Sequence, residues 1–94
     1  MAKVVKAGDL VLSKAGRDKG EYFLVVSVDG YRATIVDGRT RKVNSPKKKN
    51  IKHLETVLSA SKIELAEKIR NGKLVGNERV YSAIKSEKQK IQED

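Results

Sequence analysis

Cysteine and tryptophan are absent from this sequence of 94 residues, which also contains one proline and one histidine. Without cysteine the chain can form no disulfide, no thiolate nucleophile and no Cys-ligated zinc site, so the framework of a small secreted protein is excluded. Aromatic residues make up 4% of the chain, which predicts an aliphatic core. The length suits one small domain with an appendage and excludes a multidomain enzyme.

Long hydrophobic runs are missing as well. The N-terminal stretch MAKVVKAGDL has no more than two consecutive apolar residues. A membrane span needs about 20, and a signal peptide needs an uninterrupted apolar core. We therefore expect a soluble cytoplasmic protein with no membrane partner.

Acidic residues are missing from the middle of the chain. Lys and Arg outnumber Asp and Glu by 21 to 12, and residues 1–56 hold 13 of the basic and 6 of the acidic side chains. No acidic residue lies between Gly38 and Leu54, where seven basic residues are found: Arg39, Arg41, Lys42, Lys47, Lys48, Lys49 and Lys52. This density favours a polyanionic partner, with nucleic acid as the first expectation. The alternatives are an exposed strand edge protected by lysine and, for Lys47–Lys49, a localisation signal.

Residues 1–56 have the pattern of short strands separated by turns, typical of a small barrel or sandwich. Strands are predicted at Leu10–Leu12, Tyr22–Val28, Tyr31–Val36, Arg39–Val43 and Ile51–Leu54. Asp29-Gly30 and Asp37-Gly38 are hairpin signals, since glycine supplies the positive φ that tight turns need. The second signal makes Arg39–Val43 a short polar edge strand. Pro46 cannot donate to a strand ladder, so Asn44–Asn50 is predicted as a loop.

Residues 57–94 have a helical pattern instead. A first helix is predicted from an N-cap at Ser59 or Ser61, with Glu64 in capping-box spacing, to the end signal Asn71-Gly72. A second is predicted to begin at Asn77, a capping residue, and to reach towards residue 90. Their apolar positions are Leu58, Leu65, Ala66 and Ile69 in the first helix, and Val80, Ala83, Ile84 and Ile91 in the second. We expect these stripes to pack against the sheet or between the helices; the alternative is a helix that docks another protein.

A resemblance to the KOW motif of ribosomal proteins and NusG-type transcription factors covers residues 8–38, which read GDLVLSKAGRDKGEYFLVVSVDGYRATIVDG. Gly8-Asp9 opens the segment, and Gly16 and Gly20 bracket a basic loop before a hydrophobic strand. Residues 35–38 resemble the closing strand of the KOW-type large-subunit ribosomal proteins of eukaryotes and archaea. The basic residues 47–54 are similar to the strand that follows in those proteins. Residues 21–23 depart from the glycine pattern of many KOW segments, which favours the ribosomal type over the NusG type.

The resemblance implies a five-stranded SH3-like barrel of the KOW type at residues 1–56, and the sequence pattern adds two short C-terminal helices at 57–94, giving a mainly β chain with an α appendage. It also implies a ribosomal-protein-like or ribosome-associated factor that binds structured RNA, with ribosomal RNA as its partner. We expect the chain to be a monomer. Ribosomal proteins are a further possible partner, through the helices. The alternative is an SH3-like protein-interaction module that docks an acidic partner of the translation or transcription machinery. A third hypothesis, by analogy with the NusG-type proteins, is DNA binding in transcription elongation.

The candidate RNA-binding residues form two groups. They are Lys14, Gly16, Arg17, Lys19, Gly20 and Tyr22 in the first, and Arg39, Arg41, Lys42, Lys47, Lys48, Lys49 and Lys52 in the second. Glycine permits close approach of a sugar-phosphate chain, arginine binds phosphate with two hydrogen bonds or stacks on a base, and lysine acts as a mobile charge. The alternative is that Gly16 and Gly20 merely shape a turn and that the charges are solvated. Tyr22 and Tyr31 are candidates to stack on bases, although strand aromatics, including Phe23, are more often in the core.

Motifs for catalysis or cofactor binding are missing. His53 is the only histidine, so a metal site lacks further ligands and a general base lacks an orienting partner. The chain has no GxxxxGK followed by Ser or Thr, no GxGxxG followed by a helix, and no GxSxG. We therefore expect no enzyme activity, no metal and no cofactor, and a packed or surface position for His53.

Overall fold

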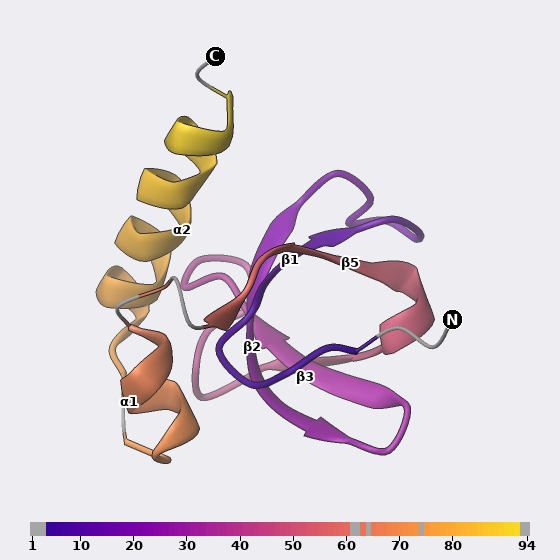
Figure 1. Cartoon of the computed structure of the whole chain (residues 1–94), viewed down its shortest axis with the longest axis horizontal. Coiled ribbons are helices and arrows are strands. Elements are labelled where there is room, and N and C mark those ends of the chain that lie inside the picture. The colour runs from indigo at the N-terminus through magenta and orange to yellow at the C-terminus, as the bar shows by residue number, and fades with distance from the viewer. Residues whose placement is uncertain (1–3, 61–62, 64, 74, 93–94) are drawn as a thin grey trace.

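The computed structural model describes residues 4–60, 63, 65–73 and 75–92. One antiparallel sheet holds five strands in the order β4-β3-β2-β1-β5, and two helices follow it (Figure 1). In chain order the elements are β1 (Leu10–Ser13), β2 (Tyr22–Asp29), β3 (Arg32–Val36), β4 (Lys47–Asn50), the 3-10 turn η1 (Ile51–His53), β5 (Leu54–Leu58), α1 (Ala66–Arg70) and α2 (Asn77–Gln92). The prediction of a mainly β chain with five strands and two C-terminal helices is confirmed.

The central strands of the sheet are buried on both faces, which explains their apolar runs. Side chains alternate between the two faces along a strand; in β2, Phe23 and Val25 join one buried cluster, whereas Leu24 joins the other. The cluster around Leu24 also contains Ile69 of α1 and Val80 of α2, so the helices cover that face. A strand covered on both sides needs apolar residues at successive positions, as β2 has.

The hairpin between β2 and β3 forms as predicted, with its turn shifted by one residue. Asp29 pairs with Arg32, so the two turn residues are Gly30 and Tyr31. Gly30 has a φ of 62°, and none of the described non-glycine residues has a positive φ. A positive φ at the first turn position alone is the pattern of a type II′ turn. Tyr31 is 61% exposed at this turn, so its prediction as a strand residue is wrong.

The predicted strand at Arg39–Val43 is wrong. The carboxylate of Asp37 accepts hydrogen bonds from the N–H groups of Arg39 and Arg41 at 2.9 and 2.7 Å, and from Thr40 Oγ1 at 2.6 Å. An aspartate whose carboxylate accepts hydrogen bonds from its own loop stabilises that loop and disfavours pairing of the same residues in a strand. The second Asp-Gly pair therefore begins a closed loop, residues 37–43, and not a hairpin.

The predicted loop at Asn44–Asn50 is wrong in its second half. Pro46 directly precedes β4, and β4 pairs with β3 along its whole length. Proline is tolerated just before or at the first residue of a strand, because its missing N–H is not needed by the ladder there. The lysines of residues 47–49 therefore lie in a strand at the edge of the sheet.

The predicted strand at Ile51–Leu54 is replaced by the turn η1 and the start of β5. Asn50 caps η1, since its side-chain oxygen accepts a hydrogen bond from the N–H of Lys52 at 3.0 Å. An asparagine that bonds a nearby N–H favours a turn over an extended chain. β5 then begins at Leu54 and pairs with β1.

The first helix is shorter than predicted. α1 begins at Ala66, well beyond Ser59, and the other capping residues, Ser61 and Glu64, lie outside the described part of the chain. The predicted end of the helix is confirmed, because Asn71 follows the last helical residue and Gly72 has a φ of 73°. A left-handed glycine after a helix is the usual way to end it.

The second helix begins at Asn77, as predicted, and is tied there to the loop that follows β3. Asn77 Oδ1 accepts a hydrogen bond from the N–H of Val43 at 2.8 Å. A side chain at Gly38 would collide with the carbonyl oxygen of Asn77 and approach the backbone nitrogen of Tyr81 to 2.9 Å. Only glycine therefore lets residues 37–43 lie this close to the first turn of α2.

The helical stripes pack against the sheet, as expected. Val80 and Ile84 of α2 are buried in the same cluster as Leu10 of β1. Ile91 is an exception, since it is 40% exposed near the end of α2. No helix in the described residues combines the length and the apolarity that crossing a membrane requires.

Candidate nucleic-acid interface

The two predicted groups of RNA-binding residues meet through an acidic residue between them. The carboxylate of Asp18, in the loop between β1 and β2, lies 2.8 Å from Lys47 Nζ and 2.6 Å from Lys49 Nζ. Ser13 Oγ donates to the same carboxylate at 2.7 Å, and Lys49 Nζ also donates to the carbonyl of Ala15 at 2.7 Å. We call Asp18, Lys47 and Lys49 the β4 lysine cluster.

The β4 lysine cluster is a structural ion pair network. Burial alone would raise the pKa of Asp18, but hydrogen bonds from Lys47, Lys49 and Ser13 outweigh burial and hold that pKa well below its usual range. The side chain of Lys49 is only 9% exposed and that of Lys47 is 29% exposed. The two lysines share one carboxylate and are partly shielded from solvent, which makes them poorer candidates for phosphate contact than their sequence position suggests.

The glycines of the β1–β2 loop serve the geometry of the loop. Gly16 and Gly20 have φ values of 85° and 91°, a region that other residues rarely adopt. A side chain at Gly16 would lie 3.3 Å from Lys49 Nζ, whereas the space beside Gly20 is open. The structure supports the alternative in which both glycines shape a turn. The open space beside Gly20 also leaves room for a ligand.

A second loop presents arginines beside the first. Burial of the Asp37 carboxyl would raise its pKa, but the hydrogen bonds from Thr40 and from the N–H groups of Arg41 and Arg39 lower it. The ionised carboxylate therefore holds this loop closed at neutral pH. Arg39 and Arg41 of this loop are exposed.

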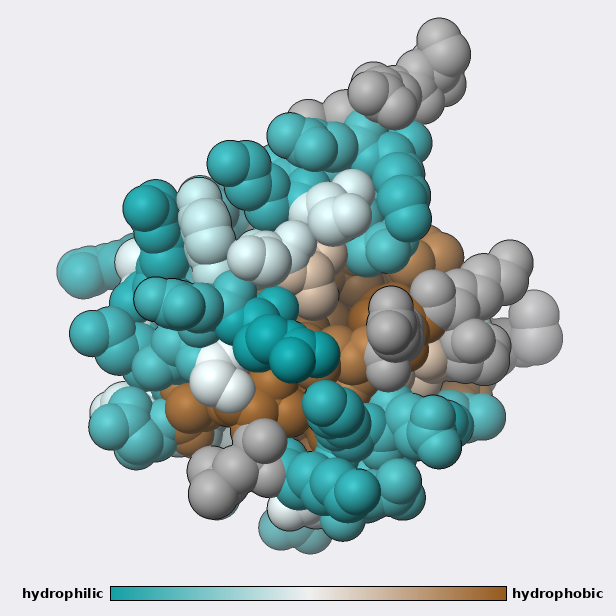
Figure 2. All heavy atoms as spheres, turned by 90° about the vertical axis from the view of Figure 1, so that its left-hand side faces the viewer, coloured by the Kyte–Doolittle hydropathy of each residue, from teal (hydrophilic) through white to brown (hydrophobic). Residues whose placement is uncertain are grey.

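A groove of about 1050 Å³ lies between these loops, the start of β2 and one side of α2. Its basic lining consists of Arg17, Arg39, Arg41, Lys47, Lys85 and Lys88, and its acidic lining of Asp18, Glu21 and Asp37. Figure 2 shows the helical side of the molecule, where hydrophilic side chains cover most of the surface around an apolar band. We call this site the α2 groove.

Five of the basic side chains in the α2 groove have no acidic partner among the described residues. No ion pair within the described residues involves Arg17, Arg39, Arg41, Lys85 or Lys88. Asp18 and Asp37 are already engaged, the first by lysines and the second by its own loop. With six basic and three acidic side chains in its lining, the groove carries a net positive charge in a concave setting, which strengthens its attraction for anions.

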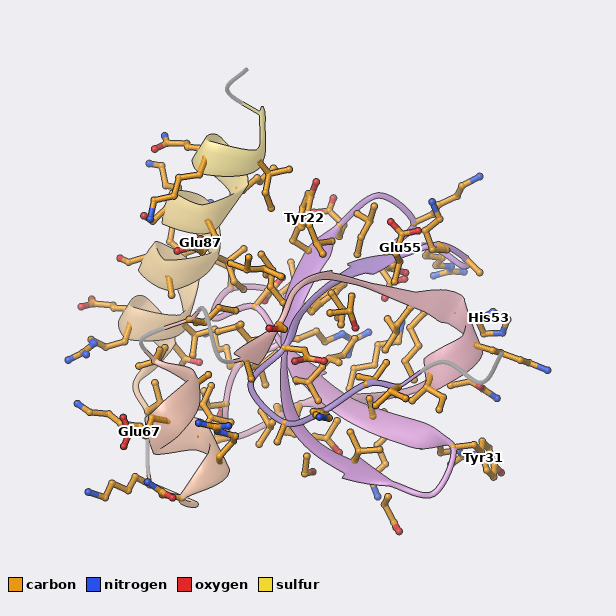
Figure 3. All side chains as sticks on the ribbon, viewed as in Figure 1. Tyr22, Tyr31, His53, Glu55, Glu67 and Glu87 are labelled. Atoms are coloured by element: carbon orange, nitrogen blue, oxygen red, sulfur yellow. The ribbon has the colours of Figure 1, made fainter. Side chains whose placement is uncertain are left out.

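Two tyrosine rings line the α2 groove, and each carries a cation from the opposite wall. The guanidinium of Arg39 lies 4.4 Å from the ring centroid of Tyr81 on α2, and Lys88 Nζ lies 5.5 Å from that of Tyr22 on β2. Figure 3 shows Tyr22 at the part of the sheet that is next to α2. Phe23, by contrast, is 2% exposed and belongs to the core.

The remaining candidates lie elsewhere on the surface. Lys14 pairs with Glu55 at 3.8 Å, and both side chains are half exposed. Such exposed ion pairs contribute little to the free energy of unfolding. Figure 3 places His53 and Tyr31 on the side of the molecule away from α2. Lys19, Lys42, Lys48 and Lys52 are exposed and do not line the α2 groove. The structure thus brings part of the predicted set together and leaves the rest dispersed.

Three groove residues escaped the sequence analysis. Tyr81, Lys85 and Lys88 follow each other at spacings of four and three, which places them on one side of a helix. They flank the apolar stripe of Val80 and Ile84, so they lie at the border between the buried face and solvent. That spacing was visible in the sequence, but nothing in it showed which loops would face this side of α2.

In the described part of the chain, no three His, Asp or Glu side chains lie close enough together to bind a metal ion. Neither a protein-family model nor a curated protein sequence matches the chain.

Proposed function

We propose that this chain is a non-enzymatic RNA-binding protein, ribosomal-protein-like or ribosome-associated, that uses an SH3-like barrel of the KOW type. The observation that carries the proposal is a set of groove cations that make no ion pair with any described residue: Arg17, Arg39, Arg41, Lys85 and Lys88. Cations gathered in one concavity beside two aromatic rings suit a ligand with both phosphates and planar bases.

The strand arrangement supports a barrel. The two edge strands, β4 and β5, are joined by the three residues of η1 alone, so the two edges of the sheet start close together. Register shifts next to Val11 in β1 and between Val25 and Ser27 in β2 mark bulges, which bend strands and increase their twist. Val11, Val25, Ile35 and Leu54 are fully buried in a cluster that includes no residue from α1 or α2, as expected for the interior of a small barrel.

Affinity would come mainly from neutralising phosphates, because each contact releases counterions condensed on the RNA. Specificity would come from RNA shape and from unpaired bases, since the base edges of an RNA duplex are poorly accessible to side chains. The proposed partner is structured RNA, and ribosomal RNA follows from the resemblance of residues 8–38 to ribosomal KOW proteins.

The test is binding of a labelled ribosomal RNA fragment, followed by fluorescence anisotropy across about 50 to 200 mM potassium chloride. The wild type should show a steep linear dependence of log affinity on log salt. Arg17→Gln/Arg41→Gln should lower that slope by about 2. Arg70→Gln/Arg79→Gln removes the same charge from exposed helical positions outside the groove and should lower it by less. An affinity that depends neither on the salt concentration nor on the groove arginines would refute the proposal.

An acidic protein partner remains the second candidate, because the same unpartnered cations would bind carboxylates. Carboxylates gain little from the two tyrosine rings, which is why RNA ranks first. Pull-downs with and without nuclease separate the two functions. Protein partners that survive nuclease treatment, together with no RNA crosslinked to the chain, would favour the protein-interaction module.

A further inference from the structure

The α2 groove differs from a simple basic patch in its shape and in its aromatic lining. Each wall contributes one ring and one cation, and each cation reaches across to the ring of the other wall. Tyr22 and Lys88 link β2 to α2, and Arg39 and Tyr81 link the closed loop to α2. These two contacts join α2 to the other wall of the groove.

We propose that α2 forms one wall of the RNA site and that the groove takes an unpaired nucleotide segment, with a base stacked on the Arg39–Tyr81 pair and phosphates bound by Arg17, Lys85 and Lys88. This inference rests on the proposed function and adds to it the class of RNA and the role of the helix.

The aromatic pairs argue for unpaired bases. A paired base has its faces covered by its neighbours in the duplex and cannot offer them to a protein ring, whereas a bulged or single-stranded base can. Aromatic rings and arginine planes both serve as stacking surfaces for such bases. The guanidinium of Arg39, at 4.4 Å from the ring centroid of Tyr81, lets a base stack on its outer face or take its place on the ring.

The volume of the groove fits the same ligand. Its volume of about 1050 Å³ lies just above the range of clefts that hold compact ligands, about 300 to 1,000 Å³. A duplex is stiff and would lie across the mouth of such a groove, where it meets the arginines but not the half-buried rings. A short flexible segment can enter it and reach both.

The position of the lysines on α2 supports a direct role for the helix. Lys85 and Lys88 lie on the same side of α2 as Tyr81, and no acidic side chain of the described residues pairs with them. Glu87, the acidic residue between them in sequence, contacts Lys90 at 3.4 Å instead. Packing of α2 on the sheet requires Val80 and Ile84, so packing alone does not explain two lysines that face the loops.

The experiment compares a fluorescein-labelled RNA hairpin that carries an adenine bulge with the same hairpin without the bulge. The wild type should bind the bulged hairpin about tenfold more tightly. Tyr81→Leu should remove this preference and leave affinity for the fully paired hairpin within about twofold, while Tyr81→Phe keeps the ring and should keep the preference. Thermal melts followed by circular dichroism verify that each variant is folded.

A second set of variants tests the role of α2. Lys85→Gln/Lys88→Gln should lower the slope of log affinity against log salt by about 2 on the bulged hairpin. Lys68→Gln/Lys73→Gln removes the same charge from exposed positions outside the groove and should change the slope by less than half as much.

The outcomes separate this inference from the proposed function. If the wild type binds neither hairpin in a salt-dependent manner, both are overturned. If it binds both hairpins equally, or if Lys85→Gln/Lys88→Gln behaves like Lys68→Gln/Lys73→Gln, only the groove assignment is overturned and RNA binding stands. A polyglutamate peptide that displaces the bulged hairpin as effectively as unlabelled hairpin does would also overturn it.

Discussion

Two groups of basic residues lie side by side in this molecule and differ in what surrounds them. In the β4 lysine cluster, Lys47 and Lys49 share the carboxylate of Asp18, and Lys49 is almost fully buried. In the α2 groove, Arg17 and Lys85 make no ion pair with any described residue. Two lysines of the densest basic run thus stabilise the fold, while two arginines of the same run join basic residues from two distant segments in the groove, where none of them makes an ion pair with a described residue. Charge density along a chain is therefore a weak measure of available charge.

The largest expected effect comes from breaking the β4 lysine cluster. Asp18→Ala leaves Lys49 buried without its carboxylate and removes both ion pairs between the β1–β2 loop and β4, so that only the hydrogen bond from Lys49 to the carbonyl of Ala15 remains. This should cost about 2–4 kcal/mol of unfolding free energy. The melting temperature should fall by roughly 10–20 °C. Asp29→Ala, at an exposed position with no hydrogen bond or ion pair to a described side chain, should change stability by less than about 0.5 kcal/mol. Equal melting temperatures for the two variants would show that the cluster contributes nothing.

Acidification should break the same cluster in the wild type. The pKa of Asp18 lies below its ordinary value of 3.8 in the folded protein, so folding favours the ionised form. Its contribution is then fully present above the unfolded pKa and is lost as the pH falls through the lower folded pKa. Asp37 acts in the same direction.

Urea unfolding at a pH of about 6 and of about 3 measures this loss. The midpoint of the wild type should fall more steeply between the two than that of Asp18→Asn, which cannot titrate at this position. A parallel decline in both proteins would assign the acid sensitivity to other carboxylates.

The comparison between the two groups also shows what could be predicted from the sequence. β1 and β2 were close to their predicted bounds, because strands buried on both faces carry continuous apolar runs. β3 was close to its predicted bounds because the Asp29-Gly30 signal marks the hairpin that precedes it. The sequence pattern missed β4 because Pro46 indicated a loop, although the resemblance to ribosomal KOW proteins implied a basic strand in residues 47–54. What stabilises residues 47–49 as a strand is pairing with β3 and a carboxylate far away in the sequence. Local composition holds no trace of either.

The second Asp-Gly pair shows the opposite failure. Asp37 and Gly38 have the local signature of a hairpin, but the aspartate bonds its own loop and the glycine is needed for contact with α2. The candidate site was predicted only in part for a related reason. Arg17, Arg39 and Arg41 were identified from charge, whereas Tyr81, Lys85 and Lys88 join them only through the packing of α2.

A smaller effect should separate two neighbouring lysines within β4. Lys49→Gln removes a buried charge from Asp18 and should lower stability by about 1–2 kcal/mol. Lys48→Gln changes an exposed side chain in the same strand and should lower it by less than about 0.5 kcal/mol. Urea unfolding of both variants measures the difference. If the two substitutions cost the same, Lys49 is not part of the structural network.

The smallest effect concerns the contact that closes the α2 groove. A double-mutant cycle of Arg39→Gln and Tyr81→Leu should give a coupling of about 0.5–1 kcal/mol, the range for a cation–π pair that is partly exposed. The corresponding cycle of Lys88→Gln and Tyr22→Leu should give less, because Lys88 Nζ is 5.5 Å from its ring centroid, against 4.4 Å for Arg39. Both cycles are measured by urea unfolding without RNA. A coupling near zero for Arg39 and Tyr81 would mean that the loop and α2 are held together by the Val43–Asn77 hydrogen bond and the close approach at Gly38, and that the guanidinium is already disengaged from the ring before a base arrives.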